Sequence, residues 1–187
     1  MNILLTNIEF FTYEHEVWYR TPDGTTKRLT ESDISLVDSL FDSIEHLYPL
    51  ACDLLRLEYK SCLPNLPYFR FRIVARFIRC NFSVLDNMPD VKDGKFSNFE
   101  CVPCPLRGEC RHEGVICRPK INHQLSGAET RVMRLWHFGL SEDTIATALC
   151  ISHHTVHNHI RNSYTKLGVH SRAEFVRIAD INNLFNE

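Results

Sequence analysis

The sequence predicts a mainly α-helical protein with three parts: an N-terminal α+β region at residues 1–98, a cysteine-rich loop module at 99–120 and a C-terminal four-helix unit at 121–187. Three observations support this fold class. Aromatic and β-branched residues flank a turn signal near the N-terminus, apolar residues recur at helical spacing through much of the remaining chain, and four cysteines fall within residues 101–117. With 44% apolar residues, the chain has enough hydrophobic side chains to bury a core.

Composition limits the classes of function. The formal net charge of −2 argues against a protein covered by nucleic acid, so any DNA contact is expected to be local. The first residues lack a basic leader, and no apolar run approaches the roughly 18 residues that a membrane span needs. Eight cysteines without a secretion signal indicate a reducing cytosol, where clustered thiols bind metal more often than they form disulfides. We therefore expect a cytoplasmic protein with no membrane contact.

The N-terminal region is expected to begin with a β-hairpin followed by a helix. In residues 7–29, aromatic and β-branched residues lie on both sides of a Pro-Asp-Gly turn signal. Thr30 is the predicted N-cap of the helix, with Asp33 three residues later. The apolar residues of that helix recur at helical spacing: Ile34, Val37, Leu40, Phe41, Ile44 and Leu47.

Two more helices are expected before the cysteines, at residues 50–61 and about 68–80, separated by prolines. The second of these carries three arginines on one face: Arg72, Arg76 and Arg79. Such a stripe is usually a solvated face and less often a contact for phosphate or an acidic partner. Residues 86–98 are polar and rich in turn formers, so they are expected to form a loop.

The C-terminal unit is predicted from its helix caps. Ser126 and Glu129 form an S-x-x-E capping box, in which each side chain satisfies a free backbone N–H of the first turn. Three further serines precede the other helices: Ser141, Ser152 and Ser171, the last in a second capping box with Glu174. The third helix is expected to run from about residue 153 to 167 and to end at Gly168. Each cap contributes only about 1 kcal/mol, but the caps agree with the apolar spacing and together predict four helices.

The third of these helices has a face suited to reading DNA. Val156, Ile160 and Leu167 point inward at helical spacing. The outward residues are small, polar or basic: His153, His154, His157, Asn158, Arg161 and Asn162. Arg holds guanine through two hydrogen bonds, Asn holds adenine, and imidazoles donate or accept, so this face fits the edges of bases in a major groove. The helix pattern alone fits a four-helix module without a DNA role equally well.

Residues 125–176 closely resemble the LuxR/GerE-type helix-turn-helix domain, found at the C-terminus of many bacterial transcription regulators. The matching motifs occur in the family's order and at its intervals: Leu125-Ser126 with Glu129, Gly139-Leu140-Ser141, Ile145-Ala146, Ile151-Ser152, Thr155-Val156, His159, Lys166-Leu167-Gly168-Val169 and Ser171-Arg172-Ala173-Glu174. The resemblance covers about a third of the chain. It implies a sequence-specific DNA-binding domain that pairs symmetrically on operator half-sites.

The resemblance also implies which residues contact DNA. His157, Asn158 and Arg161 fall where family members touch bases, although members often have Lys at the position of His157. A second set falls where members commonly contact the DNA backbone: Thr155, Lys166 and Arg172. With the outward-facing residues at the helix start, the predicted DNA-binding set has eight members: His153, His154, Thr155, His157, Asn158, Arg161, Lys166 and Arg172.

Histidines are concentrated in the C-terminal unit. Seven of the ten lie beyond residue 121, where six Lys and Arg only equal six Asp and Glu. Part of the positive charge needed near phosphates is then expected to come from protonated imidazoles. DNA affinity should in that case rise as pH falls from about 8 to 6, the range in which histidine usually gains its proton. Incidental surface histidines are an equally good interpretation.

The cysteines at 101, 104, 110 and 117 have the spacing C-x2-C-x5-C-x6-C, and prolines and glycines supply the turns between them. Four thiols within so short a segment suit one tetrahedral metal centre: Cys101, Cys104, Cys110 and Cys117. The pattern slightly favours a [4Fe-4S] cluster over zinc, because the second C-x2-C knuckle of a typical zinc site is missing. Reduced thiols without metal are a third interpretation.

The spacing C-x2-C-x5-C, with proline after the second cysteine, resembles the WhiB-like iron–sulfur regulators and the iron–sulfur DNA glycosylases. Cys80 is an alternative to Cys117 as fourth ligand, and His112 is a less favoured substitute ligand. The remaining cysteines lie in apolar patterns and are expected to be buried: Cys52, Cys62 and Cys150.

Two functions are consistent with these patterns. The first is a sequence-specific DNA-binding transcriptional regulator that responds to redox state or metal through its four-cysteine site. Its partners would be double-stranded DNA, a second copy of the chain and RNA polymerase. The alternative is an interaction adaptor built on a four-cysteine metal site, with incidental DNA contact. The sequence contains no P-loop, G-x-S-x-G or H-E-x-x-H motif, so we do not expect an enzyme.

Overall fold

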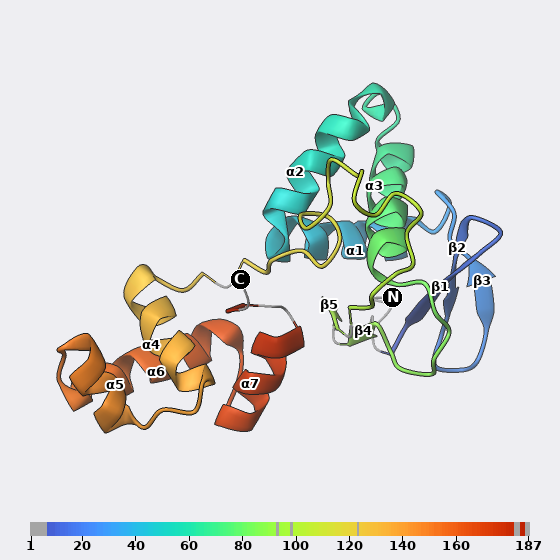
Figure 1. The fold of residues 1–187 in the computed structure, drawn as a ribbon. Coiled ribbons are helices and arrows are strands. Elements are labelled where there is room, and N and C mark those ends of the chain that lie inside the picture. The colour runs from blue at the N-terminus through green and yellow to red at the C-terminus, as the bar shows by residue number, and fades with distance from the viewer. Residues whose placement is uncertain (1–6, 93, 98, 123, 182–183, 186–187) are drawn as a thin grey trace. The chain divides into compact units, whose positions relative to one another are not determined.

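A computed structural model describes residues 7–92, 94–97, 99–122, 124–181 and 184–185 (Figure 1). The chain divides into two compact units, Met1–Asn122 and His123–Glu187, and residues 99–120 are part of the first. Both units are mainly helical and the first also contains strands, which confirms the predicted fold class. No helix in the described ranges is both long and apolar enough to cross a membrane.

The first unit opens with three antiparallel strands, in the order β1 (Glu9–Tyr13), β2 (Glu16–Arg20) and β3 (Thr26–Arg28). The predicted Pro-Asp-Gly turn joins β2 to β3 and confirms the hairpin. Gly24 takes a φ of 82° there, a conformation that glycine adopts without strain. The carboxylate of Asp23 accepts a hydrogen bond from Thr25 N at 3.1 Å, as is usual for Asp in turns.

A second tight turn, at Glu14 and His15, joins β1 to β2 and is not predicted by the sequence. Both residues take positive φ values, 50° and 65°. Two-residue hairpin turns of this kind normally contain Gly, Asn or Asp. The strands on either side pair closely, with Phe11 opposite Trp18 and their rings stacked at 6.4 Å. The predicted hairpin is therefore part of a three-stranded sheet.

The helix α1 (Ile34–Leu47) follows the sheet, and the predicted N-cap is wrong. The cap position is Asp33, whose Oδ2 accepts hydrogen bonds from N and Oγ1 of Thr30 at 2.8 and 2.9 Å. The carboxylate thus satisfies the turn before the helix instead of the first N–H groups within it. Four of the predicted core residues are buried: Val37, Leu40, Phe41 and Ile44.

Two further α-helices follow, and they differ from the predicted ranges at their ends. The segment predicted as a helix at 50–61 consists of α2 (Pro49–Glu58) and a 3₁₀ turn, η1 (Lys60–Cys62). The next helix, α3 (Leu66–Asn81), starts before the predicted residue 68. The side chain of Asn65 caps this helix, because its Oδ1 accepts a hydrogen bond from Tyr68 N at 3.2 Å. Pro67 fits the first turn because a residue there has no partner within the helix for a backbone N–H, which proline lacks.

The arginines of α3 are half-buried and contact their own unit, so they are not a solvated face. The guanidinium of Arg72 lies over the rings of Tyr59 and Tyr68, 4.7 and 5.6 Å from their centroids. Nη1 of Arg79 donates to the carbonyl oxygen of His15 at 3.5 Å. Contacts within the first unit therefore account for Arg72 and Arg79.

Residues 86–98, predicted as a loop, contain a short hairpin of β4 (Val91–Lys92) and β5 (Lys95–Phe96). Val91 is fully buried, and its carbonyl oxygen accepts a hydrogen bond from Ile8 N at 3.2 Å. Strands of this length are too short to produce a visible alternation of apolar and polar residues, so the surrounding turn formers dominate the sequence pattern.

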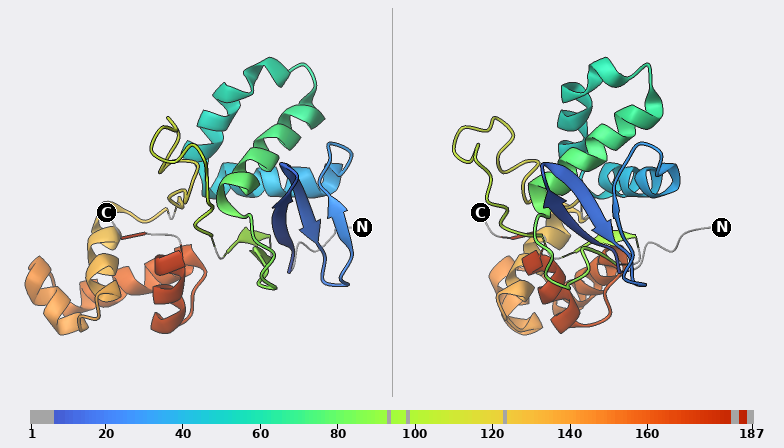
Figure 2. Two further views of the ribbon diagram at one scale, coloured as in Figure 1. Left: turned by 45° about the vertical axis from the view of Figure 1, so that its right-hand side comes forward. Right: turned by 90° about the vertical axis from the view of Figure 1, so that its right-hand side faces the viewer.

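The core of the first unit is centred on an aromatic cluster. Its rings come from the α1–α2 junction, α3 and the chain around β5, with centroids 5.1 to 6.5 Å apart: Tyr48, Phe77, Phe82, Phe96 and Phe99. Around it, α3 packs against α1 and α2 and also contacts β1 and β2 (Figure 2).

The described part of the second unit contains the four predicted helices: α4 (Gly127–His137), α5 (Glu142–Leu149), α6 (His153–Leu167) and α7 (Arg172–Ile181). The capping box at Ser126 is present, and Ser141 and Ser152 cap α5 and α6 as predicted. Gly168 ends α6 with a φ of 65°. At the start of α7, the hydroxyl of Ser171 accepts a hydrogen bond from Glu174 N at 3.2 Å. The carboxylate of Glu174 accepts a hydrogen bond from His170 N, whereas a capping box would pair it with the N–H of Ser171.

Candidate nucleic-acid interface

The turn between α5 and α6 sets the direction of the candidate DNA-reading helix. Cys150 takes the left-handed conformation there, with φ 53° and ψ 43°, at a position where Gly is usual. It is exposed, so the expectation that Cys150 is buried is wrong. Ser152 then starts α6, its Oγ accepting from Thr155 N at 3.1 Å and lying 2.8 Å from Thr155 Oγ1.

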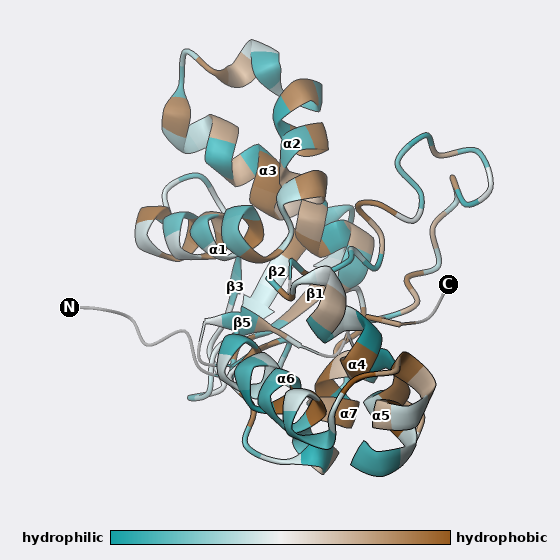
Figure 3. Cartoon of the chain, turned by 90° about the vertical axis from the view of Figure 1, so that its left-hand side faces the viewer, coloured by the Kyte–Doolittle hydropathy of each residue, from teal (hydrophilic) through white to brown (hydrophobic). Residues whose placement is uncertain are grey.

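The inner face of α6 packs against α4 and α5, and its outer face is polar (Figure 3). Val156 and Ile160 are buried in the core of the second unit, together with the hydroxyl of Ser163. Four of the predicted DNA-binding residues are exposed on the outer face: His153, His154, His157 and Arg161. Thr155 and Asn158 are half-buried at its edges. The helix is thus fixed by its apolar side and presents the predicted side chains outward.

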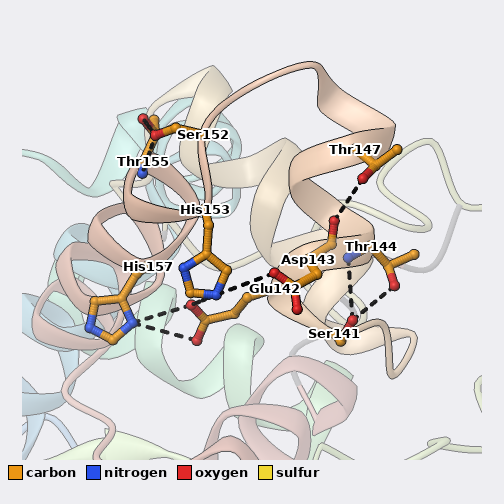
Figure 4. A network of polar contacts seen from close by, with 9 residues as sticks. All are labelled: Ser141, Glu142, Asp143, Thr144, Thr147, Ser152, His153, Thr155 and His157. Atoms are coloured by element: carbon orange, nitrogen blue, oxygen red, sulfur yellow. Dashed lines mark hydrogen bonds and ion pairs between the residues drawn. The ribbon is translucent and has the colours of Figure 1, made fainter.

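Two of the exposed histidines lie against carboxylates of α5 (Figure 4). Oε2 of Glu142 is 3.3 Å from Nδ1 of His157 and 3.5 Å from Nε2 of His153. His153 also lies 3.7 Å from Oδ1 of Asp143. Both carboxylates are in the first turn of α5, where the positive end of the helix favours them and Ser141 caps the backbone. Glu142 therefore lies within ion-pair distance of two imidazoles of the candidate interface.

Sequence reasoning identifies Glu142 and Asp143 only as favourable residues at a helix start. Their contact with His153 and His157 depends on how α5 and α6 cross, and no short-range pattern encodes that crossing. A partial signal is available in retrospect: two acidic residues directly after the cap of the helix that precedes a histidine-rich helix.

Lys166 and Arg172 have structural contacts within the second unit. Nζ of Lys166 lies 2.7 Å from the buried carboxylate of Glu129. Burial opposes the ionisation of Glu129, but the hydrogen bonds from Lys166 and Ser126 outweigh it and lower the pKa of this carboxyl. Nη2 of Arg172 donates to the carbonyl oxygens of Trp136 and Leu140 at 2.7 and 3.2 Å, and its guanidinium lies 3.9 Å from the centre of the Trp136 ring. Their predicted contacts with the DNA backbone stay predictions.

The predicted metal ligands lie in the first unit, in an irregular segment that we call the cysteine loop, residues 101–117. Cys101 is exposed, whereas Cys104, Cys110 and Cys117 are half-buried. Among the described residues, no three His, Cys, Asp or Glu side chains are already arranged as a metal-binding group. The metal centre and its identity therefore stay predictions.

Comparison with known families agrees with the arrangement of α4 to α7. Residues 123–179 match the family model described as GerE, bacterial regulatory proteins of the luxR family. The match does not extend to the cysteine loop, so it gives no support to the resemblance with WhiB-like regulators. Neither the curated proteins nor the solved structures gave a significant match. Residues 123–179 are a LuxR/GerE-family helix-turn-helix domain, which implies a DNA-binding transcriptional regulator.

Proposed function

We propose that the chain is a sequence-specific DNA-binding transcriptional regulator that reads the major groove with α6. The observation that supports this most is the outer face of α6, where Arg161 and His157 are exposed beside Asn158 in a domain of a DNA-binding family. Arg and Asn are the side chains that pair best with guanine and adenine. The positive end of α6, near Thr155, suits a backbone phosphate.

The same proposal includes two copies on one operator, as a homodimer, and a contact with RNA polymerase. It also includes regulation by a metal or by redox state through the cysteine loop. The family match at residues 123–179 supports the DNA-binding part of this proposal.

Selection of duplexes from a random pool tests the proposal directly. A specific regulator retains a subset of sequences at salt concentrations that release non-specific complexes, because non-specific binding depends almost entirely on phosphate contacts. Loss of all sequences together on raising the salt would leave only non-specific binding and would favour an interaction protein.

Replacing Arg161 with Ala should reduce affinity for a selected duplex by about 5- to 150-fold, corresponding to about 1–3 kcal/mol, and relax the preference at one base pair. Arg131→Ala is the matched control, because Arg131 is also exposed but lies on α4. Electrophoretic mobility shifts with point-substituted duplexes measure both effects. An equal loss on every duplex would make Arg161 a phosphate contact and contradict base reading.

The contacts of Glu142 support the expected pH dependence of DNA affinity. Protonated His153 and His157 would neutralise Glu142, which otherwise repels phosphates near the interface. Among the described residues, the other charged or titratable groups around these imidazoles are Asp143, Arg161, Tyr164 and His170. We expect affinity to rise as pH falls from about 8 to 6, where histidine usually becomes protonated.

The variant Glu142→Gln should bind more tightly than the unaltered chain at pH 8 and show a flatter pH profile, because no negative charge then needs neutralising. Fluorescence anisotropy with a labelled duplex at pH 6, 7 and 8 measures this. Asp53→Asn removes one negative charge from an exposed position in the first unit and serves as control. An unaltered chain whose affinity is constant over this range while folded would contradict the role of the imidazoles.

A further inference from the structure

The cysteine loop is tied to the end of α3 by the side chain of Asn81, which is fully buried. Nδ2 of Asn81 donates to the carbonyl oxygen of Ile116 at 2.8 Å, and Oδ1 accepts from the backbone N of Arg118 at 2.7 Å. These two hydrogen bonds lie on either side of Cys117. Because Cys80 directly precedes Asn81, the same side chain brings Cys117 next to Cys80.

The two thiols are in contact. The side chains of Cys80 and Cys117 are close enough for a hydrogen bond between them, and Cys104 lies near both. Cys110 lies within the same range of Cys117. The side chains of four cysteines thus lie near one another, one in the last turn of α3 and three in the cysteine loop: Cys80, Cys104, Cys110 and Cys117.

The backbone conformation of the cysteine loop explains why these thiols lie close together. Ile116 is buried in the core of the first unit, and the backbone N of Glu100 donates to the carbonyl oxygen of Asn81 at 2.9 Å, so both ends of the loop are fixed. Between them, the backbone turns back at two of the cysteines. The carbonyl oxygen of Cys104 accepts from Arg107 N at 3.2 Å, and that of Cys110 accepts from Glu113 N at 3.0 Å.

Cys101 differs from the other three cysteines of the loop, because it is exposed and has no part in the contacts just described. We propose that Cys80, Cys104, Cys110 and Cys117 bind one metal centre through four thiolates, with Cys80 taking the place that the sequence spacing assigns to Cys101. The proposal concerns the first unit and does not depend on the proposed DNA-binding function.

The surroundings suit a thiolate-bound metal. Four thiolates around a divalent ion leave a net negative charge, and nearby cations stabilise thiolates. Arg76 lies one turn before Cys80 and within electrostatic range of Cys80, Cys104 and Cys110, and Arg107 is near Cys117. Among the described residues these thiols do not lie at the mutual distances of a metal-binding group, so the proposal requires that metal binding deprotonates them and draws them together.

Such a donor set takes either zinc or an iron–sulfur cluster, since both prefer four thiolates. The chain should be purified without oxygen and analysed for metal by mass spectrometry, with visible absorption to reveal a cluster. Cys80→Ser should lose the metal, whereas the matched control Cys101→Ser should retain the full content of the unaltered chain. Retention in Cys80→Ser with loss in Cys101→Ser would overturn the proposal, and so would an unaltered chain without zinc or iron.

Alkylation of the unaltered chain tests the ligand set without relying on a variant that folds. In the metal-loaded protein, peptide mass spectrometry should show Cys101 modified while the four proposed ligands are protected. A chelator should then expose the four ligands together. Modification of Cys80 before chelation, with Cys101 protected, would contradict the assignment.

Discussion

In the second unit, each helix starts beside a serine whose hydroxyl accepts a backbone N–H three residues later. In the first unit, the contacts that fix the structure join distant residues. Phe10 N donates to Asp90 Oδ2 at 2.7 Å, across 80 positions, and Asn81 binds the cysteine loop across 35 and 37 positions. A contact over three residues leaves a pattern in a short stretch of sequence, whereas a contact over 80 residues does not. This difference explains why the sequence predicts the second unit more closely.

Each unit also contains a buried carboxyl group whose pKa is shifted, and these two groups respond to pH in opposite directions. In the first unit, burial raises the pKa of Asp90 to about 8, although the hydrogen bond from Phe10 N opposes the rise. In the second, the hydrogen bonds from Lys166 and Ser126 outweigh burial and lower the pKa of Glu129. A raised pKa in the folded state stabilises at low pH and a lowered one at high pH, so these two groups affect their units oppositely.

The largest change in the free energy of unfolding is expected when a ring is removed from the aromatic cluster, which joins distant segments of the first unit. Phe77→Ala should lower the free energy of unfolding of this unit by about 3–5 kcal/mol, because it removes a fully buried ring and leaves a cavity. Urea unfolding followed by the fluorescence of Trp18, in a Trp136→Phe background, measures the change.

Phe138→Ala is the matched control for this loss, because Phe138 is 62% exposed. Because Phe138 lies in the second unit, this control is followed by Trp136 fluorescence in a Trp18→Phe background, and it should change stability by no more than about 0.5 kcal/mol. A loss below about 1 kcal/mol for Phe77→Ala would show that the aromatic cluster does not hold the first unit together.

The pH dependence of Asp90 should have the next largest effect. Compared with an Asp of ordinary pKa, near 4, Asp90 stabilises the fold most below pH 4, and this contribution is lost as pH rises towards about 8. Between pH 6 and 8 the first unit should therefore lose up to about 1.4 kcal/mol per pH unit. Asp90→Asn cannot ionise and keeps an oxygen acceptor for Phe10 N, so it should remove this loss.

Urea unfolding at pH 6, 7 and 8, again followed by Trp18, measures the slope with pH. Asp42→Asn makes the same chemical change at an exposed position of the same unit and should leave the slope unchanged. Parallel slopes for the unaltered chain and Asp90→Asn would mean that Asp90 ionises normally and would contradict its raised pKa.

The sequence predicts the fold wherever local signals decide it. The turn at Glu14 and His15 escapes prediction because neither residue is a usual turn former, and only strand pairing requires their positive φ values. The cap of α1 is misplaced because a Thr and an Asp three residues apart fit two arrangements, and the sequence does not say which residue accepts the hydrogen bond.

The candidate interface is predicted as far as helical spacing allows, since spacing decides which residues of α6 face outward. Spacing does not reveal partners from other helices. Glu142 contacts His157 across 15 positions, and Arg172 contacts the carbonyl oxygen of Trp136 across 36. Likewise, the spacing of the cysteines does not reveal that Cys80 on α3 contacts Cys117, because this depends on the buried Asn81.

The smallest change in the free energy of unfolding is expected when a single N-cap is removed from a helix of the second unit, because one cap contributes little to stability. Ser152→Ala should destabilise this unit by about 1 kcal/mol, because Thr155 N loses the acceptor it has at 3.1 Å. Ser152→Gly should cost only a few tenths of a kcal/mol, since glycine is also tolerated at an N-cap. Urea unfolding followed by Trp136 fluorescence distinguishes the two variants. If both lost the same stability, the hydroxyl would not be what starts α6, and the second unit would depend on its core packing in the same way as the first.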